Sequence, residues 1–298
     1  MDVLIPMLVD GLAASATIFF IAVGLTLVFS VLRVLNVAHG SFYSIGAYIA
    51  VSIGGVATSA GLSPWLSFPI LLFSAVLVAA LLGPFIEATF IRWTYGKPEA
   101  VQILVTFALF LVFEDLQKLV FGVQSFYQDA AMQVLGVSEI GGIIYLNYQL
   151  LMIALAVLTI VGLRLMLSHT RLGKFIVAVV ADPEISQTLG INARRVYAAA
   201  FTIGVFLAAL GGALATPTSG VAPGLGADAI VLGFAVAAIG GLGQIEGAAI
   251  AAVIVGLTRV LAIYYAPAFE PVMPYLVMLA VLLVRPYGLF GAAQARRI

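Results

Sequence analysis

The sequence predicts an all-α integral membrane protein, a polytopic bundle of about eight or nine transmembrane helices in two related halves. Of its 298 residues, 63% are hydrophobic and 9% are charged, whereas a soluble domain carries about a quarter charged residues. Apolar runs recur along the whole chain, and basic residues lie at alternate ends of these runs. This number of polar side chains is too small to cover the surface of a soluble protein, and we therefore expect the surface to face lipid. Residues 1–298 are expected to form one transmembrane domain.

The apolar runs define the expected spans, because about 20 consecutive apolar residues are needed to cross a bilayer as a helix. Seven runs of roughly this length lie at 11–32, 66–91, 100–121, 148–168, 197–216, 246–266 and 269–285. Two weaker segments, 37–57 and 228–243, are interrupted by glycine and either cross fully or re-enter from one side. Counting both gives about nine crossings.

The charged residues predict the orientation of these spans, because cytoplasmic loops are enriched in lysine and arginine. Threading nine spans places the following basic residues on one side, the cytoplasm: Arg33, Arg92, Lys97, Arg164, Arg171, Lys174, Arg194, Arg195, Arg285, Arg296 and Arg297. The acidic residues Asp2, Asp10, Asp129, Glu139, Asp228 and Glu270 fall on the other side. We therefore expect the N-terminus outside and the C-terminus in the cytoplasm. The start of the chain lacks a basic region, so a cleavable signal peptide is not expected.

Two loops are long enough to have roles of their own. The outer loop, residues 122–147, is mildly acidic and aromatic, and it either closes over a vestibule, receives a partner or serves as a solvated connector. Residues 169–196 form a cytoplasmic polar loop in an otherwise apolar chain.

The polar loop contains signals for a short, well-capped helix. Asp182 can accept hydrogen bonds from the first free N–H groups, Pro183 suits the first helical turn, and Glu184 favours the positive helix end. Gly190 is a natural stop in the left-handed conformation. Ile185 and Leu189 share one face of this helix. Such a helix either docks in a groove of a cytoplasmic protein or lies on lipid headgroups, with the flanking arginines bound to anionic lipid.

The glycine-interrupted segments suggest a polar pathway through the membrane. The first segment places polar side chains at the start of a span, and the second contains a run of glycines before another span. Polar groups at membrane depth must be satisfied or line a wet cavity. The similar pentapeptides GAYIA (46–50) and GAAIA (247–251) point to related halves; close helix packing by small residues is the alternative. The candidate pathway residues are Asn36, His39, Ser41, Tyr43, Ser44, Gly240, Gly241 and Gly243.

Few charged residues fall within the predicted spans. Glu114 and Asp115 can both reach Lys118, and Arg259 lies inside a later span. These four residues either line a vestibule or form buried ion pairs, with Arg259 pairing with one of the two acids. An ion-coupled carrier needs ionisable groups at mid-depth, and only Arg259, and Glu87 if its helix is shifted, are available.

Composition argues against several other functions. The chain has no cysteine and only two histidines, far apart in sequence, so neither a metal site nor any other bound cofactor is expected. The net charge is zero, which gives no signal for nucleic-acid binding. GGLGQIEG lacks the strand–turn–helix context of a dinucleotide site, and the chain contains no P-loop motif, so any ATPase must be a separate subunit. An enzyme is not expected.

At the polar loop the chain resembles a known family. RLGKFIVAVVADPEISQTLGIN is similar to the cytoplasmic coupling loop of branched-chain amino acid ABC transporter permeases of the LivH type, although Ser186 stands where alanine is usual. The resemblance extends to residues 24–50, 233–256 and 285–291, in the family's order. It implies that the loop contacts the ATPase through Arg171, Gly173, Lys174, Asp182, Glu184, Ile185, Leu189, Gly190, Ile191 and Asn192.

The resemblance also implies a function and its partners. It describes the permease subunit of an ABC importer in a bacterial inner membrane, which moves branched-chain amino acids or a related small polar solute by alternating access. Two cytoplasmic ATPase subunits, a second similar permease, a periplasmic solute-binding protein and membrane lipid are the implied partners; a heterodimer of permeases is the usual arrangement, and a homodimer is possible. The alternative is a stand-alone carrier or channel for a small solute such as urea or an amide.

Overall fold

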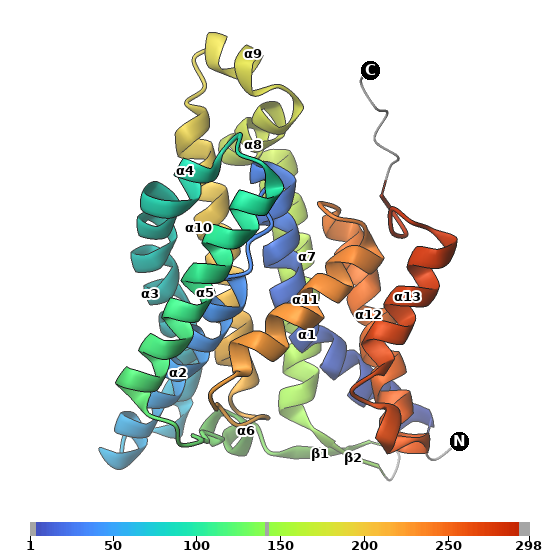
Figure 1. The fold of residues 1–298 in the computed structure, drawn as a ribbon. Coiled ribbons are helices and arrows are strands. Elements are labelled where there is room, and N and C mark those ends of the chain that lie inside the picture. The colour runs from blue at the N-terminus through green and yellow to red at the C-terminus, as the bar shows by residue number, and fades with distance from the viewer. Residues whose placement is uncertain (1–3, 141–142, 292–298) are drawn as a thin grey trace.

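The computed structural model describes residues 4–140 and 143–291, and within them the chain is a bundle of long helices that run between two ends of the molecule (Figure 1). Asp2, Arg296 and Arg297, which contributed to the predicted orientation, lie outside the described residues.

The elements of the first half are mostly helical. They are α1 (Leu4–Leu32), α2 (His39–Ser59), η1 (Pro64–Leu66), α3 (Ser67–Ile86), the π-helical turn η2 (Glu87–Ile91), α4 (Arg92–Thr94), α5 (Glu99–Phe121), α6 (Ala130–Leu135), β1 (Val137–Ile140) and β2 (Ile143–Leu146).

The second half continues the helical bundle. Its elements are α7 (Asn147–His169), α8 (Arg171–Ala181), α9 (Pro183–Thr188), α10 (Ala193–Ala215), α11 (Leu225–Gly240), α12 (Ile245–Tyr265), η3 (Pro267–Phe269) and α13 (Met273–Val284).

Small residues bring α1 and α10 close to their neighbours at the centre of the bundle. α1 packs against α12, α10, α11 and α7, while α10 also packs against α3 and α2. A Cβ added at Gly256 of α12 would lie 2.7 Å from the Cα of Ser15, and one added at Gly212 of α10 would lie 1.9 Å from the backbone oxygen of Tyr43. Glycine is therefore required at these crossings, because it allows helix backbones to approach more closely than any other residue.

The helices confirm a multi-pass membrane protein. Among the described residues, six helical segments have the length and composition of membrane spans: Leu4–Leu32, His39–Ser59, Pro64–Thr94, Asn147–His169, Ala193–Ala215 and Ile245–Tyr265. α5 matches a further predicted run, while α11 and α13, with 16 and 12 residues, are shorter than the usual span of about 20 residues. The count of about nine crossings and the two related halves therefore stay predictions.

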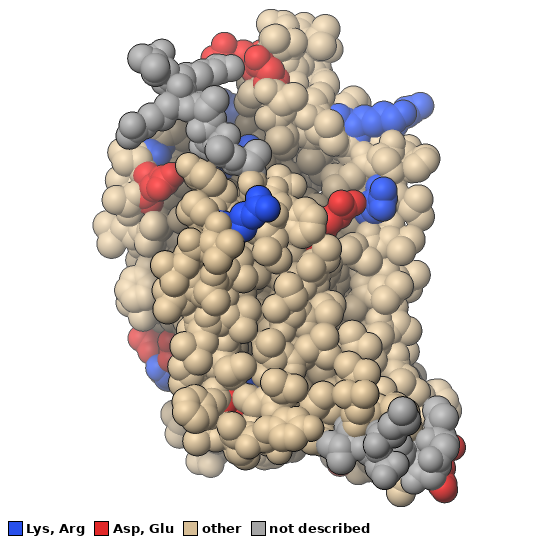
Figure 2. All heavy atoms as spheres, turned by 90° about the vertical axis from the view of Figure 1, so that its right-hand side faces the viewer, with Lys and Arg blue, Asp and Glu red and all other residues tan. Residues whose placement is uncertain are grey.

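The two ends of the bundle differ in structure. α8 and α9 project at one end, whereas α6, β1 and β2 lie at the other end, near the start of α1 (Figure 1). On the face shown in Figure 2, charged side chains gather toward both ends and leave an uncharged belt between them, as expected for a protein whose middle faces lipid. The assignment of the α8–α9 end to the cytoplasm is still a prediction from the basic residues.

Two loops contain more structure than the sequence suggested. The outer loop, residues 122–147, contains α6 and an antiparallel β1–β2 hairpin, and Phe126 pairs with Val221 through two backbone hydrogen bonds of 2.9 Å. In the polar loop, residues 171–181 form the additional helix α8. α8 buries Ile176 and Val179 and exposes Arg171 and Lys174, and the apolar side chains of Phe175 and Val177 are exposed as well.

Candidate functional site

The polar loop, residues 169–196, folds into α8, α9 and the start of α10. Thr170 caps α8 by accepting a hydrogen bond from the backbone N–H of Gly173 at 3.0 Å. A Cβ at Gly173 would lie 2.1 Å from the backbone oxygen of Met166, so glycine is needed for α8 to fold back on the end of α7. This close contact ties the loop to a membrane helix.

The capping residues of α9 act as the sequence predicts. Oδ1 of Asp182 accepts hydrogen bonds from the N–H groups of Glu184 and Ile185, both at 2.9 Å. Gly190 has a φ of +85°, and the next residue, Ile191, donates its N–H to the oxygen of Ser186 at 3.0 Å. α9 is thereby fixed at both ends by local contacts.

The tip of the polar loop exposes two large apolar side chains. Ile185 is 58% exposed and Leu189 is 76% exposed. Around them Arg171, Lys174, Glu184 and Arg194 are exposed as well. Asn192 caps the start of α10 through a 3.1 Å hydrogen bond from the N–H of Arg195, so the apolar pair is presented on a fixed frame.

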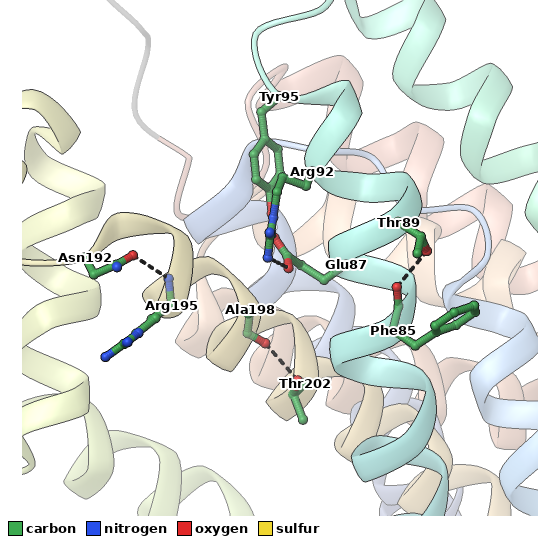
Figure 3. A network of polar contacts seen from close by, with 9 residues as sticks. All are labelled: Phe85, Glu87, Thr89, Arg92, Tyr95, Asn192, Arg195, Ala198 and Thr202. Carbon is green, nitrogen blue, oxygen red and sulfur yellow. Dashed lines mark hydrogen bonds and ion pairs between the residues drawn. The ribbon is translucent and has the colours of Figure 1, made fainter.

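A buried carboxylate lies beside the polar loop, at the end of α3 (Figure 3). Glu87 is fully buried and accepts hydrogen bonds from Nη2 of Arg92 at 2.6 Å and from the hydroxyl of Tyr95 at 2.9 Å. The π-helical turn makes the first contact possible, since its i to i+5 hydrogen bond joins the N–H of Arg92 to the oxygen of Glu87. Burial, and then the Glu87 carboxylate, raise the pKa of Tyr95, so its hydroxyl stays protonated and donates.

The network of Glu87, Arg92 and Tyr95 contacts α10, just after the polar loop, through aromatic rings. Tyr95 packs edge-on against Tyr197 of α10, with ring centroids 5.1 Å apart. Arg92 and Tyr95 also line a groove of about 720 Å³ together with Gly190 and Asn192 of the polar loop. The segment that follows α3 and the polar loop therefore border the same groove. From the sequence, Glu87 is only a candidate mid-depth group, because residues five apart do not face each other on an ordinary α-helix, so its contact with Arg92 is not predicted.

The predicted pathway residues before and at the start of α2 are almost completely buried. We call residues 33–44 the entry segment; they are a short non-helical stretch followed by the first turns of α2. Asn36 and His39 are 0% exposed and Ser41 is 1% exposed. Among the described residues, the side chains of Asn36 and Ser41 have no hydrogen-bond partner. Unpaired buried polar groups are costly and rare, so they mark this segment as unusual.

Other contacts hold the entry segment in place. The Thr106 hydroxyl lies 3.1 Å from the backbone oxygen of Leu35, and the backbone oxygens of Gln102 and Ile103 in its own helix, at 3.0 and 3.2 Å, share its single proton. The Ser44 hydroxyl donates to the backbone oxygen of Ser41 at 3.0 Å. The ring of His39 packs edge-on against Phe42. The entry segment thus packs against α5, while the side chains of Asn36, His39 and Ser41 have no hydrogen-bond partner among the described residues.

The predicted pathway glycines lie at the opposite end of α11 from Gly40, and a Cβ at Gly243 would lie 3.4 Å from the Cα of Ser30, near the end of α1. A Cβ at Gly40 would lie 2.2 Å from the oxygen of Gly226, at the start of α11. Gly240, Gly241 and Gly243 lie at or just after the other end of α11, about 20 Å away at 1.5 Å per residue. Gly241 and Gly243 have φ angles of +100° and +87° and make the tight turn into α12.

The charges of α5 lie next to the entry segment. Lys118 pairs with Glu114 at 3.1 Å and with Asp115 at 3.3 Å, which confirms that both acids reach it. Ser41, Ser44, Glu114 and Lys118 line one small cavity of about 10 Å³. The structure therefore brings part of the predicted pathway and the predicted vestibule together.

The predicted ion pair of Arg259 with Glu114 or Asp115 is wrong. Arg259 pairs with Glu270, not with Glu114 or Asp115, because the turn η3 after α12 folds Glu270 back against that helix. Within residues 4–140 and 143–291, no group of three or more His, Asp or Glu side chains is placed to hold a metal ion.

Comparison with known proteins covers nearly the whole chain. Residues 7–284 match the family described as branched-chain amino acid transport system, permease component. The chain is 29% identical to the high-affinity branched-chain amino acid transport system permease protein BraD of Pseudomonas aeruginosa, over 98% of this chain and 97% of that protein. It is 26% identical to the LivH permease protein of Escherichia coli K12, over 97% and 96%, and 28% identical to a probable LivH of Methanocaldococcus jannaschii, over 96% and 92%. No solved structure matches it.

Proposed function

Because the chain belongs to the family of permease components of branched-chain amino acid transport systems, we propose that it is the membrane-spanning subunit of an ABC importer. It moves branched-chain amino acids, or a related small polar solute, into the cytoplasm by alternating access. ATP is hydrolysed by separate subunits, since the sequence contains no P-loop.

The observation that carries this proposal is the tip of the polar loop. A helix fixed by Asp182 and Gly190 exposes Ile185 and Leu189 beyond the ends of the other helices (Figure 1). Exposed apolar side chains on a rigid frame suit a groove of a protein partner, because their burial is favourable and little flexibility is lost. We assign this surface to the ATPase subunits, one for each permease.

The remaining partners follow from the proposed reaction. A second similar permease completes the pore, and a periplasmic binding protein delivers the solute at the end that contains α6, β1 and β2. The location is the bacterial inner membrane. In this arrangement the Glu87 network transmits movement of the polar loop to α3, because Tyr95 touches both Glu87 and Tyr197.

Reconstitution of the complete complex in proteoliposomes tests the proposal. Vesicles loaded with ATP and supplied externally with the binding protein should accumulate labelled leucine, isoleucine or valine. Vesicles loaded with a nonhydrolysable ATP analogue should not. Solute movement by the chain alone, without nucleotide, would instead support a stand-alone carrier or channel.

A further inference from the structure

A second cleft lies between α1, α2, α11 and α12, in the half of the bundle that contains α6 and the hairpin. Its volume is about 310 Å³, at the lower end of the usual range for small-molecule sites, about 300–1,000 Å³. Charged residues of both signs line it, Arg259 and Asp228, together with apolar side chains. This combination is uncommon at membrane depth and is a functional signal by default.

Arg259 lines the cleft with a side chain that is 35% exposed, and its two Nη groups have no ion pair recorded among the described residues. It comes six residues before the end of α12 at Tyr265, about 9 Å along the helix at 1.5 Å per residue. Its recorded hydrogen bond within the described residues runs from Nε to Glu270. The two Nη groups of a guanidinium supply further N–H donors in a geometry that suits a carboxylate.

Asp228 supplies the opposite charge. It lies in the first turn of α11, which begins after the left-handed Gly224. Its side chain is exposed and lines the cleft. Among the described residues its carboxylate has no hydrogen-bond or ion-pair partner. An ammonium group is the natural partner of an unpaired carboxylate in a cleft.

The rest of the cleft combines hydroxyls with an apolar wall. Tyr43 and Ser219 contribute hydroxyl groups, while Ile18, Ile21 and Leu232 contribute apolar surface. A cation, an anion and an apolar wall in one small cleft match the three parts of an amino acid with an aliphatic side chain. A uniformly polar, uncharged solute such as urea would offer no charge to Asp228 and no apolar group to the wall, while Arg259 would keep its ion pair with Glu270.

We propose that this cleft binds the zwitterionic solute during transport, with Arg259 toward its carboxylate, Asp228 toward its ammonium group and Leu232 toward its side chain. The inference rests on the proposed function and deepens it by assigning the site. The principal solute contacts then lie in the cleft between α1, α2, α11 and α12, not in the buried entry segment. Tyr43 belongs to both, because it lies in the entry segment and lines the cleft.

Uptake by the reconstituted complex, with saturating solute-loaded binding protein, tests the assignment. Asp228→Asn keeps the size of the side chain and removes its charge, so leucine uptake should fall by about tenfold, the loss expected for one charge-assisted hydrogen bond. ATP hydrolysis stimulated by the binding protein should persist. The matched control is Glu246→Gln, an exposed acid in the first turn of α12, at the opposite end of that helix from Arg259, which should leave uptake unchanged.

A second variant probes the apolar wall. Leu232→Phe narrows the cleft, so leucine uptake should fall more than alanine uptake. Wild-type uptake by Asp228→Asn, or equal losses of leucine and alanine in Leu232→Phe, would overturn the assignment while leaving the importer intact. A wild-type complex that hydrolyses ATP but accumulates no amino acid would overturn the proposed function as well. The wild type alone reveals that failure, so it is distinguished from a failure of the site assignment, which only the variants reveal.

Discussion

The polar loop and the entry segment satisfy their polar groups in opposite ways. In the polar loop, Thr170, Asp182 and Asn192 each cap a helix with their own side chains. In the entry segment, Asn36 and Ser41 are buried with no partner within the described residues. A surface element whose polar groups are hydrogen-bonded can act as a rigid contact. Buried polar groups without hydrogen bonds raise the free energy of this conformation, and another conformation that pairs them can lower it. We therefore assign docking to the first region and conformational change to the second.

Replacing Asn36 should have the largest effect on transport. Asn36→Leu removes a polar group that has no partner in this structure, so the thermal stability of the purified protein should not fall. If Asn36 gains a hydrogen bond in another transport state, uptake should drop by about tenfold or more, since an unmet bond costs about 1–3 kcal/mol.

A paired residue nearby provides the control for Asn36. Thr106→Val removes the hydrogen bond to Leu35, so it should lower the free energy of unfolding by about 1 kcal/mol. Both variants are compared by thermal unfolding in detergent. Equal losses of thermal stability in Asn36→Leu and Thr106→Val would contradict the distinction between an unpaired Asn36 and a hydrogen-bonded Thr106.

The left-handed residue of the polar loop gives the next largest effect. Gly190→Val forces a branched side chain to φ +85°, which should cost about 1–2 kcal/mol, although no atom lies within 4 Å of the added Cβ. Membrane insertion should persist while ATP-driven uptake falls. Gly190→Asn should retain more activity, because asparagine tolerates this conformation, and Gly162→Val, at an open helical position, controls for size. Full uptake by Gly190→Val would show that the loop does not need this shape.

Removing a cap should have a smaller effect. Asp182→Ala loses two hydrogen bonds at the start of α9 and should destabilise the loop by about 1 kcal/mol. Limited proteolysis of the purified protein should show faster cleavage between residues 182 and 190 without general unfolding. Unchanged cleavage would mean that other contacts hold α9.

The smallest effect on stability is expected at the tip. Leu189 is 76% exposed, so Leu189→Ser should change the free energy of unfolding by less than about 0.5 kcal/mol. Its effect should appear only as weaker binding of the ATPase subunits. A marked loss of thermal stability in Leu189→Ser would show that the side chain packs within the subunit.

The same contrast explains what the sequence could and could not predict. α7 and α12 fall within one residue of the predicted runs 148–168 and 246–266, and the caps at Asp182 and Gly190 are confirmed, because apolar length and cap chemistry act locally. The ion pair of Arg259 with Glu270 depends on the turn η3, and the contact of Glu87 with Arg92 depends on a π-helical turn. Such pairs require a backbone geometry that spacing alone does not specify. The assignment of transport roles to individual residues is still a prediction.

The central claim is that the tip of the polar loop receives the ATPase subunits. The most direct test purifies the tagged chain and its Ile185→Ser, Leu189→Ser double variant from their native membrane in mild detergent, and identifies stoichiometric partners by mass spectrometry. We expect P-loop ATPases to copurify with the wild type and to be lost from the double variant, which still inserts in the membrane. Recovery of the wild-type chain without ATPases, stable and able to move solute without ATP, would contradict the claim.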